Sequence, residues 1–180
     1  MTISDAQRPP SNEAAIALDH LVVRYGSRRA VNGLTLDVPR GSVFGLLGPN
    51  GAGKTTTIKT LLGFRPPTSG SARVLGYDIT RQRLQMNAHI GFVSETNSLY
   101  LSMTIREILA FCRATARRWN QGVVERYLHL FGLPTNTHVR QLSKGMRTQL
   151  ALCLALGSEP ELLILDEPMT GLDPSRGTPF

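Results

Sequence analysis

The sequence has little that could cross-link the chain or anchor it in a membrane. Two cysteines and one tryptophan occur among its 180 residues, and the longest uninterrupted apolar run covers only residues 150–156. A membrane-spanning helix needs about 20 apolar residues, and the N-terminal segment lacks the basic start and apolar stretch of a signal peptide. We therefore expect a soluble, cytoplasmic protein in which Cys112 and Cys153 are reduced thiols of the core.

Acidic residues are scarce relative to basic ones. The chain has 13 Asp and Glu against 20 Lys and Arg, a net charge of +7, and most of the basic residues are arginines. Guanidinium groups suit phosphates and carboxylates, so an anionic partner is permitted but not identified. The arginines between residues 106 and 126 are expected to form a solvated helix surface rather than a nucleic-acid patch. With 41% apolar residues the chain can bury a core, which excludes a disordered protein.

The apolar pattern predicts an α/β fold. Residues 1–15 are polar and are expected to form a flexible N-terminal segment. Period-two alternation over residues 16–38 predicts small antiparallel strands. A continuous apolar stretch over residues 43–47 predicts a parallel strand buried on both faces, and a helix from about Gly53 is expected to stop at Gly63.

The second half of the chain changes character. Apolar residues at spacings of three and four between residues 103 and 133 predict helices, which suggest an inserted helical lobe at about residues 98–140. Residues 90–93 and 162–165 are apolar and predict two further buried strands. The whole pattern indicates a parallel sheet core with a small antiparallel β subdomain and a helical lobe.

The turn that follows the stretch 43–47 matches G-x-x-x-x-G-K-[ST], the phosphate-binding P-loop, at the place where a helix is expected to begin. In such a loop the backbone N–H groups turn toward phosphate oxygens, the lysine reaches the β- and γ-phosphates, and the hydroxyl after it can bind Mg²⁺. The predicted binding residues are Gly48, Pro49, Asn50, Gly51, Ala52, Gly53, Lys54, Thr55 and the adjacent Thr56.

Two acids follow the last predicted strand. Asp166 and Glu167 come directly after residues 162–165, at the carboxyl end where open α/β sheets bind their ligands. Asp166 is predicted to hold Mg²⁺, directly or through water. Glu167 is predicted to orient and deprotonate an attacking water. Alone, such a pair could equally be an ordinary surface pair. Together with the P-loop it indicates a nucleotide site.

These motifs, in this order, resemble the ATP-binding subunit of an ABC transporter over about residues 16–174. Between the P-loop and Asp166 lies the stretch 141–146, QLSKGM, which is similar to the family signature LSGGQ and precedes an apolar helix. The resemblance implies that Ser143, a good helix N-cap, and Gly145 complete the phosphate pocket of an opposite subunit. The working unit would then be a homo- or heterodimer that sandwiches two ATP molecules.

The resemblance also implies roles for single residues. Tyr25 matches the aromatic that stacks on adenine, although a strand aromatic of the core would look the same. Glu95 stands where the family usually has a glutamine that contacts the metal and the attacking water. The stretch 171–173 matches the loop through which Asp173 communicates across the dimer.

The resemblance has departures too. Lys144 and Met146 replace a glycine and a glutamine of the signature, and Glu95 replaces a glutamine. Such variants resemble export-type ATPases that are separate polypeptides from their permease. The family's later histidine and strands have no counterpart after Asp173, so we expect the C-terminal part of the core to be missing and this domain, residues 16–180, to be incomplete.

The sequence thus predicts an ATPase subunit of an ABC exporter, with ATP and Mg²⁺ as cofactors and with Lys54, Glu95 and Glu167 as catalytic residues. Its expected partners are a second ATP-binding subunit and an integral membrane permease, through which it would lie on the inner face of the cell membrane. No nucleic-acid partner is expected. Alternatives are a nucleotide-binding remnant without turnover and, with support only from the positive charge, a soluble ABC-type ATPase that acts on nucleic acid or ribosomes.

Overall fold

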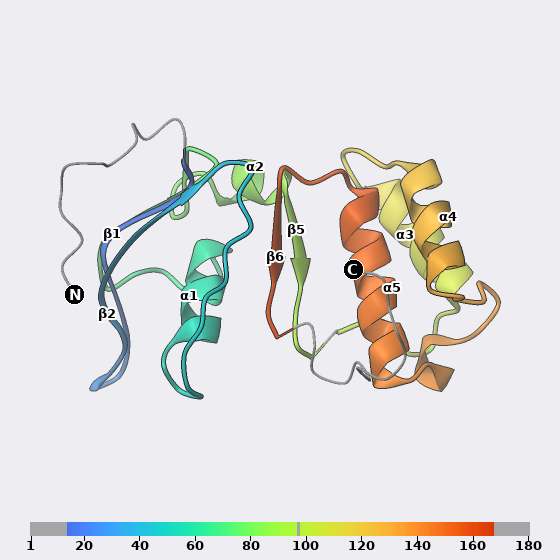
Figure 1. Cartoon of the computed structure of the whole chain (residues 1–180), viewed down its shortest axis with the longest axis horizontal. Coiled ribbons are helices and arrows are strands. Elements are labelled where there is room, and N and C mark those ends of the chain that lie inside the picture. The colour runs from blue at the N-terminus through green and yellow to red at the C-terminus, as the bar shows by residue number, and fades with distance from the viewer. Residues whose placement is uncertain (1–13, 97, 168–180) are drawn as a thin grey trace. The chain divides into compact units, whose positions relative to one another are not determined.

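The computed structural model describes residues 14–96 and 98–167, which belong to two compact units (Figure 1). The first unit ends at Ala88 and the second begins at His89. Over the described residues, no helix combines the length and the apolar character that crossing a bilayer would require.

The first unit contains a four-stranded antiparallel sheet in the order β2-β1-β3-β4, which confirms the antiparallel prediction. In this sheet Leu18 of the central strand pairs with Leu36 on one side and Ala72 on the other, and Leu18 is fully buried. Because Ala14 and Ala15 are part of the first strand, the sheet begins before the expected residue 16. The strands are β1 (Ala14–Tyr25), β2 (Arg28–Pro39), β3 (Ser69–Val74) and β4 (Tyr77–Asp78).

An irregularity in β1 changes which residues face the core. Leu18, Leu21 and Val23 are all fully buried, although strict alternation would place Leu18 and Leu21 on opposite faces. The register shifts between Leu18 and Leu21, and His20 between them has a left-handed φ of 47°. This bulge resets the alternation, so both ends of the strand keep their apolar side chains on the buried face.

Two helices complete the first unit. Helix α1 (Lys54–Leu61) buries Thr57, Ile58, Thr60 and Leu61. It ends before Gly63, whose φ of 70° is the left-handed conformation that closes many helices, as the sequence predicts. The short helix α2 (Arg83–Asn87) adds the fully buried Met86.

The prediction of a buried strand over residues 43–47 is wrong for this structure. Residues 42–49 form no strand, and Val43 and Leu47 are almost fully exposed while Phe44 is half exposed. Apolar side chains suit a buried strand, but a strand exists only where a neighbour supplies the ladder hydrogen bonds. Among the described residues this stretch pairs with no strand, so it runs as an extended connection from β2 to α1.

The second unit begins with two strands that pair in parallel, β5 (Ile90–Val93) and β6 (Leu162–Leu165), as the sequence predicts. Ile90 pairs with Leu162 and Val93 with Leu165, so the strands end together. The helices between them are α3 (Ile105–Thr115), α4 (Gln121–Leu130), the 3-10 turn η2 (Val139–Gln141) and α5 (Lys144–Gly157), and Figure 1 shows α3, α4 and α5 packed as a group.

Three of these helices begin at a polar cap. The Thr104 hydroxyl accepts a hydrogen bond from the Glu107 N–H, and the Glu107 carboxylate accepts one from the Thr104 N–H, which makes a capping box. The bonds that Thr104 donates lower the pKa of Glu107. Asn120 caps α4 and Ser143 caps α5, the latter through a 3.2 Å bond from the Met146 N–H. The predicted N-cap at Ser143 is thus confirmed.

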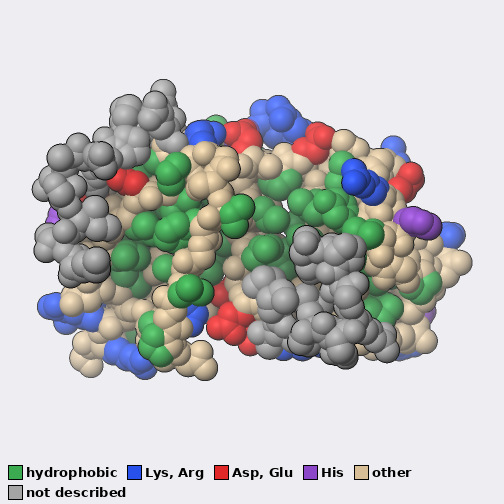
Figure 2. Space-filling model, viewed as in Figure 1, with side chains coloured by type: hydrophobic (Ala, Val, Ile, Leu, Met, Phe, Trp, Pro, Cys, Tyr) green, Lys and Arg blue, Asp and Glu red, His purple; other side chains and the backbone are tan. Residues whose placement is uncertain are grey.

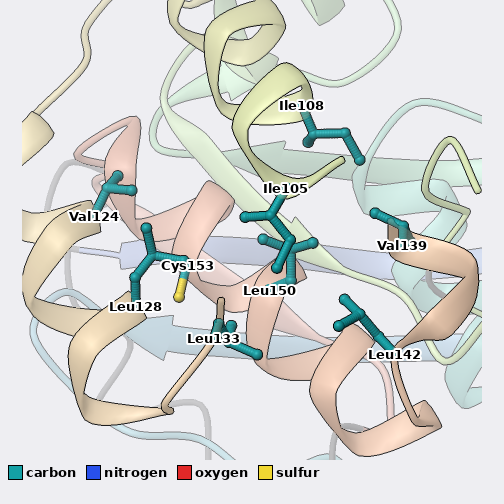
Figure 3. Packing of buried hydrophobic residues seen from close by; sticks show 9 residues of the cluster. All are labelled: Ile105, Ile108, Val124, Leu128, Leu133, Val139, Leu142, Leu150 and Cys153. Atoms are coloured by element: carbon teal, nitrogen blue, oxygen red, sulfur yellow. The ribbon is translucent and has the colours of Figure 1, made fainter. Parts of the chain in front are cut away.

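The helices share one apolar core, to which α5, beyond the predicted lobe, adds Leu150 and Cys153. Figure 3 shows Leu150 of α5 among residues of α3, α4 and the 3-10 turn. Cys153 is fully buried, and burial raises the pKa of its thiol to about 12. Both cysteines are free, as expected, and Cys112 is partly buried. The cluster consists of Ile105, Ile108, Val124, Leu128, Leu133, Val139, Leu142, Leu150 and Cys153.

Truncation of Leu150 tests this core. Leu150 is 0% exposed, so Leu150→Ala should lower the free energy of unfolding by about 2–5 kcal/mol, because it leaves a cavity as well as losing apolar burial. Leu130→Ala on α4 is the matched control, since Leu130 is 50% exposed and should change the stability by less than about 0.5 kcal/mol. Urea unfolding followed by circular dichroism measures both, and equal effects would contradict the assignment of the core.

Candidate functional site

The P-loop occupies the turn before α1, and its conformation depends on glycine. Gly51 and Gly53 have φ angles of 83° and 96°, a region that other residues rarely adopt. A Cβ atom on Gly53 would lie 2.3 Å from the carbonyl oxygen of Ala30 in β2. The loop therefore packs directly against the sheet backbone and tolerates no side chain at Gly53.

Lys54 stabilises the same turn. Its Nζ donates hydrogen bonds to the carbonyl oxygens of Gly48 at 2.7 Å and Pro49 at 3.3 Å. The loop is closed further by the Ala52 N–H, which donates to the Pro49 carbonyl at 3.1 Å. The ammonium group is thus held above the loop that leads into α1.

The residues at this helix start fit a phosphate group. Within the described chain no side chain caps α1, its N-cap is Gly53, and no acidic residue lies in its first turn. The positive end of the helix dipole is therefore not countered by a local carboxylate, and it lies next to the Lys54 ammonium. A triphosphate would find backbone N–H groups, a lysine and the Thr55 and Thr56 hydroxyls in one turn of chain.

The net positive charge of the chain comes mainly from the first unit. Residues 14–88 contain ten Lys and Arg against three Asp, and no Glu, whereas residues 89–167 contain eight Lys and Arg against seven Asp and Glu. Figure 2 shows basic side chains over the end of the first unit where the β1–β2 hairpin turns. The unit that carries the P-loop therefore attracts anions, while the other is nearly balanced.

Three acids follow the paired ends of the two parallel strands in the second unit. Since Val93 and Leu165 pair at the ends of β5 and β6, the chain leaves both strands at the same edge. The Asp166 N–H donates to the Val93 carbonyl at 2.9 Å, which brings Asp166 next to the stretch that leads to Glu95. Asp166 is buried, whereas Glu95 and Glu167 are exposed.

The backbone at Glu167 is unusual. Its φ of 51° lies in the left-handed region, which costs a residue other than glycine about 1 kcal/mol or more. Such outliers occur often at functional sites, because the surrounding structure must hold them. The chain turns sharply here and separates the buried Asp166 from the exposed Glu167.

The remaining predicted residues lie at two other places. Ser143 and Gly145 are at the start of α5, where the Ser143 hydroxyl is engaged as the helix cap. Tyr25 ends β1 and is 43% exposed, so it is not the buried core aromatic that the alternative reading of the sequence required. The loop at 171–173 lies outside the described residues.

Two arginines that no sequence motif predicts lie beside Tyr25. The Arg65 guanidinium carbon lies 4.6 Å from the centre of the Tyr25 ring. Arg28, which pairs with Tyr25 across the hairpin, brings its Nη2 within 3.6 Å of the position that a Cβ on Gly51 would take. No motif marks either arginine, because the contacts join segments far apart in the chain.

Comparison with known proteins decides the family. The ABC transporter family model matches residues 31–170, which is more than half of the chain. This chain belongs to the ABC transporter family. The match runs from β2 through the P-loop and the start of α5 to the acids after β6. Tyr25 and the stretch 171–173 lie outside it.

Similar ABC transporter proteins are ATP-binding proteins of transport systems. The Nod factor export ATP-binding protein I of Paraburkholderia xenovorans (strain LB400) is 41% identical over 167 residues, which cover 90% of this chain and 55% of that protein. The bacitracin transport ATP-binding protein BcrA of Bacillus licheniformis is 38% identical over 156 residues, 86% of this chain and 51% of that one. The chain spans about half the length of these relatives.

A solved structure shares the fold of this ABC transporter family member. The structure described as the ATP binding subunit of an ABC transporter superposes with a TM-score of 0.79 at 31% identity, and covers 89% of this chain and 69% of that one. The P-loop NTPase fold with an antiparallel sheet and a parallel sheet, which the sequence predicts, is thus confirmed.

Substitution of Gly53 tests the P-loop geometry of this ABC transporter domain. Gly53→Ala should lower the free energy of unfolding by about 2–5 kcal/mol. The cost of the left-handed φ adds to the cost of the steric overlap between the new Cβ and the Ala30 carbonyl. Gly41→Ala is the matched control, because Gly41 also has a left-handed φ, 70°, but a Cβ there meets nothing within 4 Å. The control should lose only about 1–2 kcal/mol. If the two variants unfold at the same urea concentration, the packing of Gly53 against β2 is not what fixes the loop.

Proposed function

We propose that this chain binds ATP with Mg²⁺ and hydrolyses the nucleotide as the ATP-binding subunit of an ABC exporter. The observation that carries the proposal is the P-loop, where two left-handed glycines and Lys54 precede a helix start that has no acidic residue. Relatives whose names describe export and transport ATP-binding proteins favour the export type.

In this proposal the phosphates bind along residues 48–56. The backbone of the loop donates hydrogen bonds to phosphate oxygens, and Lys54 exchanges its bonds to the Gly48 and Pro49 carbonyls for the β- and γ-phosphates. The exchange needs only a rotation of the lysine side chain, since the ammonium already lies above the loop. Tyr25 would stack on the base, and its exposed ring supports that role.

Thr55, Asp166 and Glu95 are the proposed ligands of the metal. Mg²⁺ prefers oxygen ligands and is usually bound by one or two protein groups together with substrate phosphates. When bound, it neutralises charge that develops on the phosphate oxygens. The buried Asp166 suits a fixed ligand, since burial and its backbone bond to Val93 restrict its position.

Glu167 would act on the attacking water. Its carboxylate is exposed and follows the metal-binding aspartate directly, so it can accept a proton from a water molecule at the γ-phosphate. Ser143 and Gly145 at the start of α5 would complete the phosphate site of a second ATP-binding subunit. A membrane permease would be the further partner, which would place the chain on the inner face of the cell membrane. We propose no nucleic-acid partner.

Variants of Lys54 and Glu167 test this function by separating binding from turnover. Lys54→Ala should weaken the equilibrium binding of a fluorescent ATP analogue by at least about tenfold, because a charge-assisted contact to phosphate is lost. Glu167→Gln should bind the analogue normally but lose Mg²⁺-dependent phosphate release by at least about 100-fold, since a general base typically contributes that much.

Glu125→Gln is the matched control for Glu167→Gln. Glu125 lies on α4, and its Oε1 accepts a 3.0 Å bond from the Gln121 amide that a glutamine oxygen can also accept. This variant should bind and hydrolyse ATP as the original chain does. Normal turnover by Glu167→Gln would show that Glu167 is not the general base. Failure of the original chain to bind ATP would refute the proposed function.

A further inference from the structure

We infer that Arg65 is a positioning residue for the nucleotide base. It packs on one face of the Tyr25 ring and leaves the other face free for the base to stack on. The inference rests on the proposed ATP site and assigns a role to a residue that lies outside its motifs. All the contacts that carry it lie within residues 14–88.

Arg65 makes two contacts at the end of β1. Its guanidinium carbon is 4.6 Å from the centre of the Tyr25 ring, a cation–π distance, and its Nη2 donates a 2.7 Å hydrogen bond to the carbonyl oxygen of Arg24. The backbone bond fixes the guanidinium plane beside the ring. Because a ring has two faces and Tyr25 remains 43% exposed, a second planar group can still stack on it.

The segment that carries Arg65 is itself tied to both β1 and α1. The N–H groups of Phe64 and Arg65 donate to the Lys59 carbonyl at 2.9 and 3.3 Å, at the end of α1. Three residues later the Thr68 N–H donates to the Val22 carbonyl, and the Thr68 hydroxyl accepts from the Arg24 N–H. The connecting segment 64–68 thus joins the far end of the P-loop helix to the strand that ends at Tyr25.

The Tyr25 end of the hairpin also lies beside the phosphate loop. Arg28, the strand partner of Tyr25, places its guanidinium next to Gly51. A ligand with phosphates on the P-loop would therefore carry its remaining part toward Tyr25. The site suits a nucleoside triphosphate, with the base on Tyr25 and the ring held from behind by Arg65.

If Arg65 positions the base, its loss should weaken the binding of ATP but not the binding of inorganic triphosphate, which has no base. Equilibrium binding of ATP and of inorganic triphosphate is measured for the original chain and for Arg65→Gln. The variant should bind ATP about two- to fivefold more weakly, the range of an exposed cation–π contact, and bind inorganic triphosphate unchanged. A general disturbance of the P-loop would weaken both ligands, so equal losses would overturn the inference.

Two further variants test whether the effect of Arg65→Gln is specific to the Tyr25 ring. Arg73→Gln removes the same charge from an exposed arginine that pairs with Ala17 near the start of β1, and it should leave both affinities unchanged. Tyr25→Leu should lose ATP affinity, and adding Arg65→Gln to it should cost nothing more, because the ring that Arg65 holds is gone.

The possible outcomes distinguish the inference from the function on which it rests. If the original chain binds ATP but Arg65→Gln binds it equally well or more tightly, Arg65 does not position the ring, or it competes with the base, and the inference is overturned. If the original chain binds neither ATP nor inorganic triphosphate, the proposed function itself fails.

Discussion

The close approach of the P-loop to β2 is the constraint on which the candidate site depends. With 2.3 Å between the Ala30 carbonyl and the place of a Gly53 Cβ, the loop cannot shift toward the sheet, and the left-handed φ of Gly53 fixes the direction in which α1 begins. Lys54 and the Thr55 hydroxyl follow from that direction, because they are the first residues of the helix. This backbone contact thus fixes where the helix that carries Lys54 and Thr55 begins.

The same unit contains a second fixed point at Tyr25. The P-loop, α1 and the connecting segment 64–68 form one continuous stretch of chain that starts beside Gly51 and returns to the end of β1. In the proposed site a base and a triphosphate would thus be contacted by neighbouring parts of one small sheet and the helix that packs on it. The excess of basic residues in this unit favours the anionic part of such a ligand.

Sequence motifs predicted the parts of the site that local backbone geometry determines. Glycines at fixed spacing predicted the turn before α1, where Gly51 and Gly53 prove to be left-handed, and Ser143 predicted the start of α5. Caps and turns can be predicted because they depend on residues close in the chain. The apolar residues 162–165 correctly predicted β6 and the acids at its end.

Features that depend on contacts between residues far apart in the chain could not be predicted from the sequence. Residues 43–47 have the composition of a buried strand. A strand also needs a neighbouring strand to pair with, and the composition of a segment does not show whether one is present. The Arg65–Tyr25 contact joins residues 40 positions apart, and a guanidinium on a ring leaves no periodic signal. The bulge in β1 likewise lies where the pairing with both neighbouring strands shifts register.

The central claim is that the P-loop and the acids after β6 bind the same nucleotide and metal. Iron-mediated cleavage tests it directly: Fe²⁺ replaces Mg²⁺ in the presence of ATP, ascorbate and peroxide are added, and mass spectrometry maps where the backbone is cut. The account predicts two ATP-dependent cuts, one close to Thr55 and one close to Asp166. Cleavage near Thr55 alone, or cuts at both places that do not depend on ATP, would contradict it.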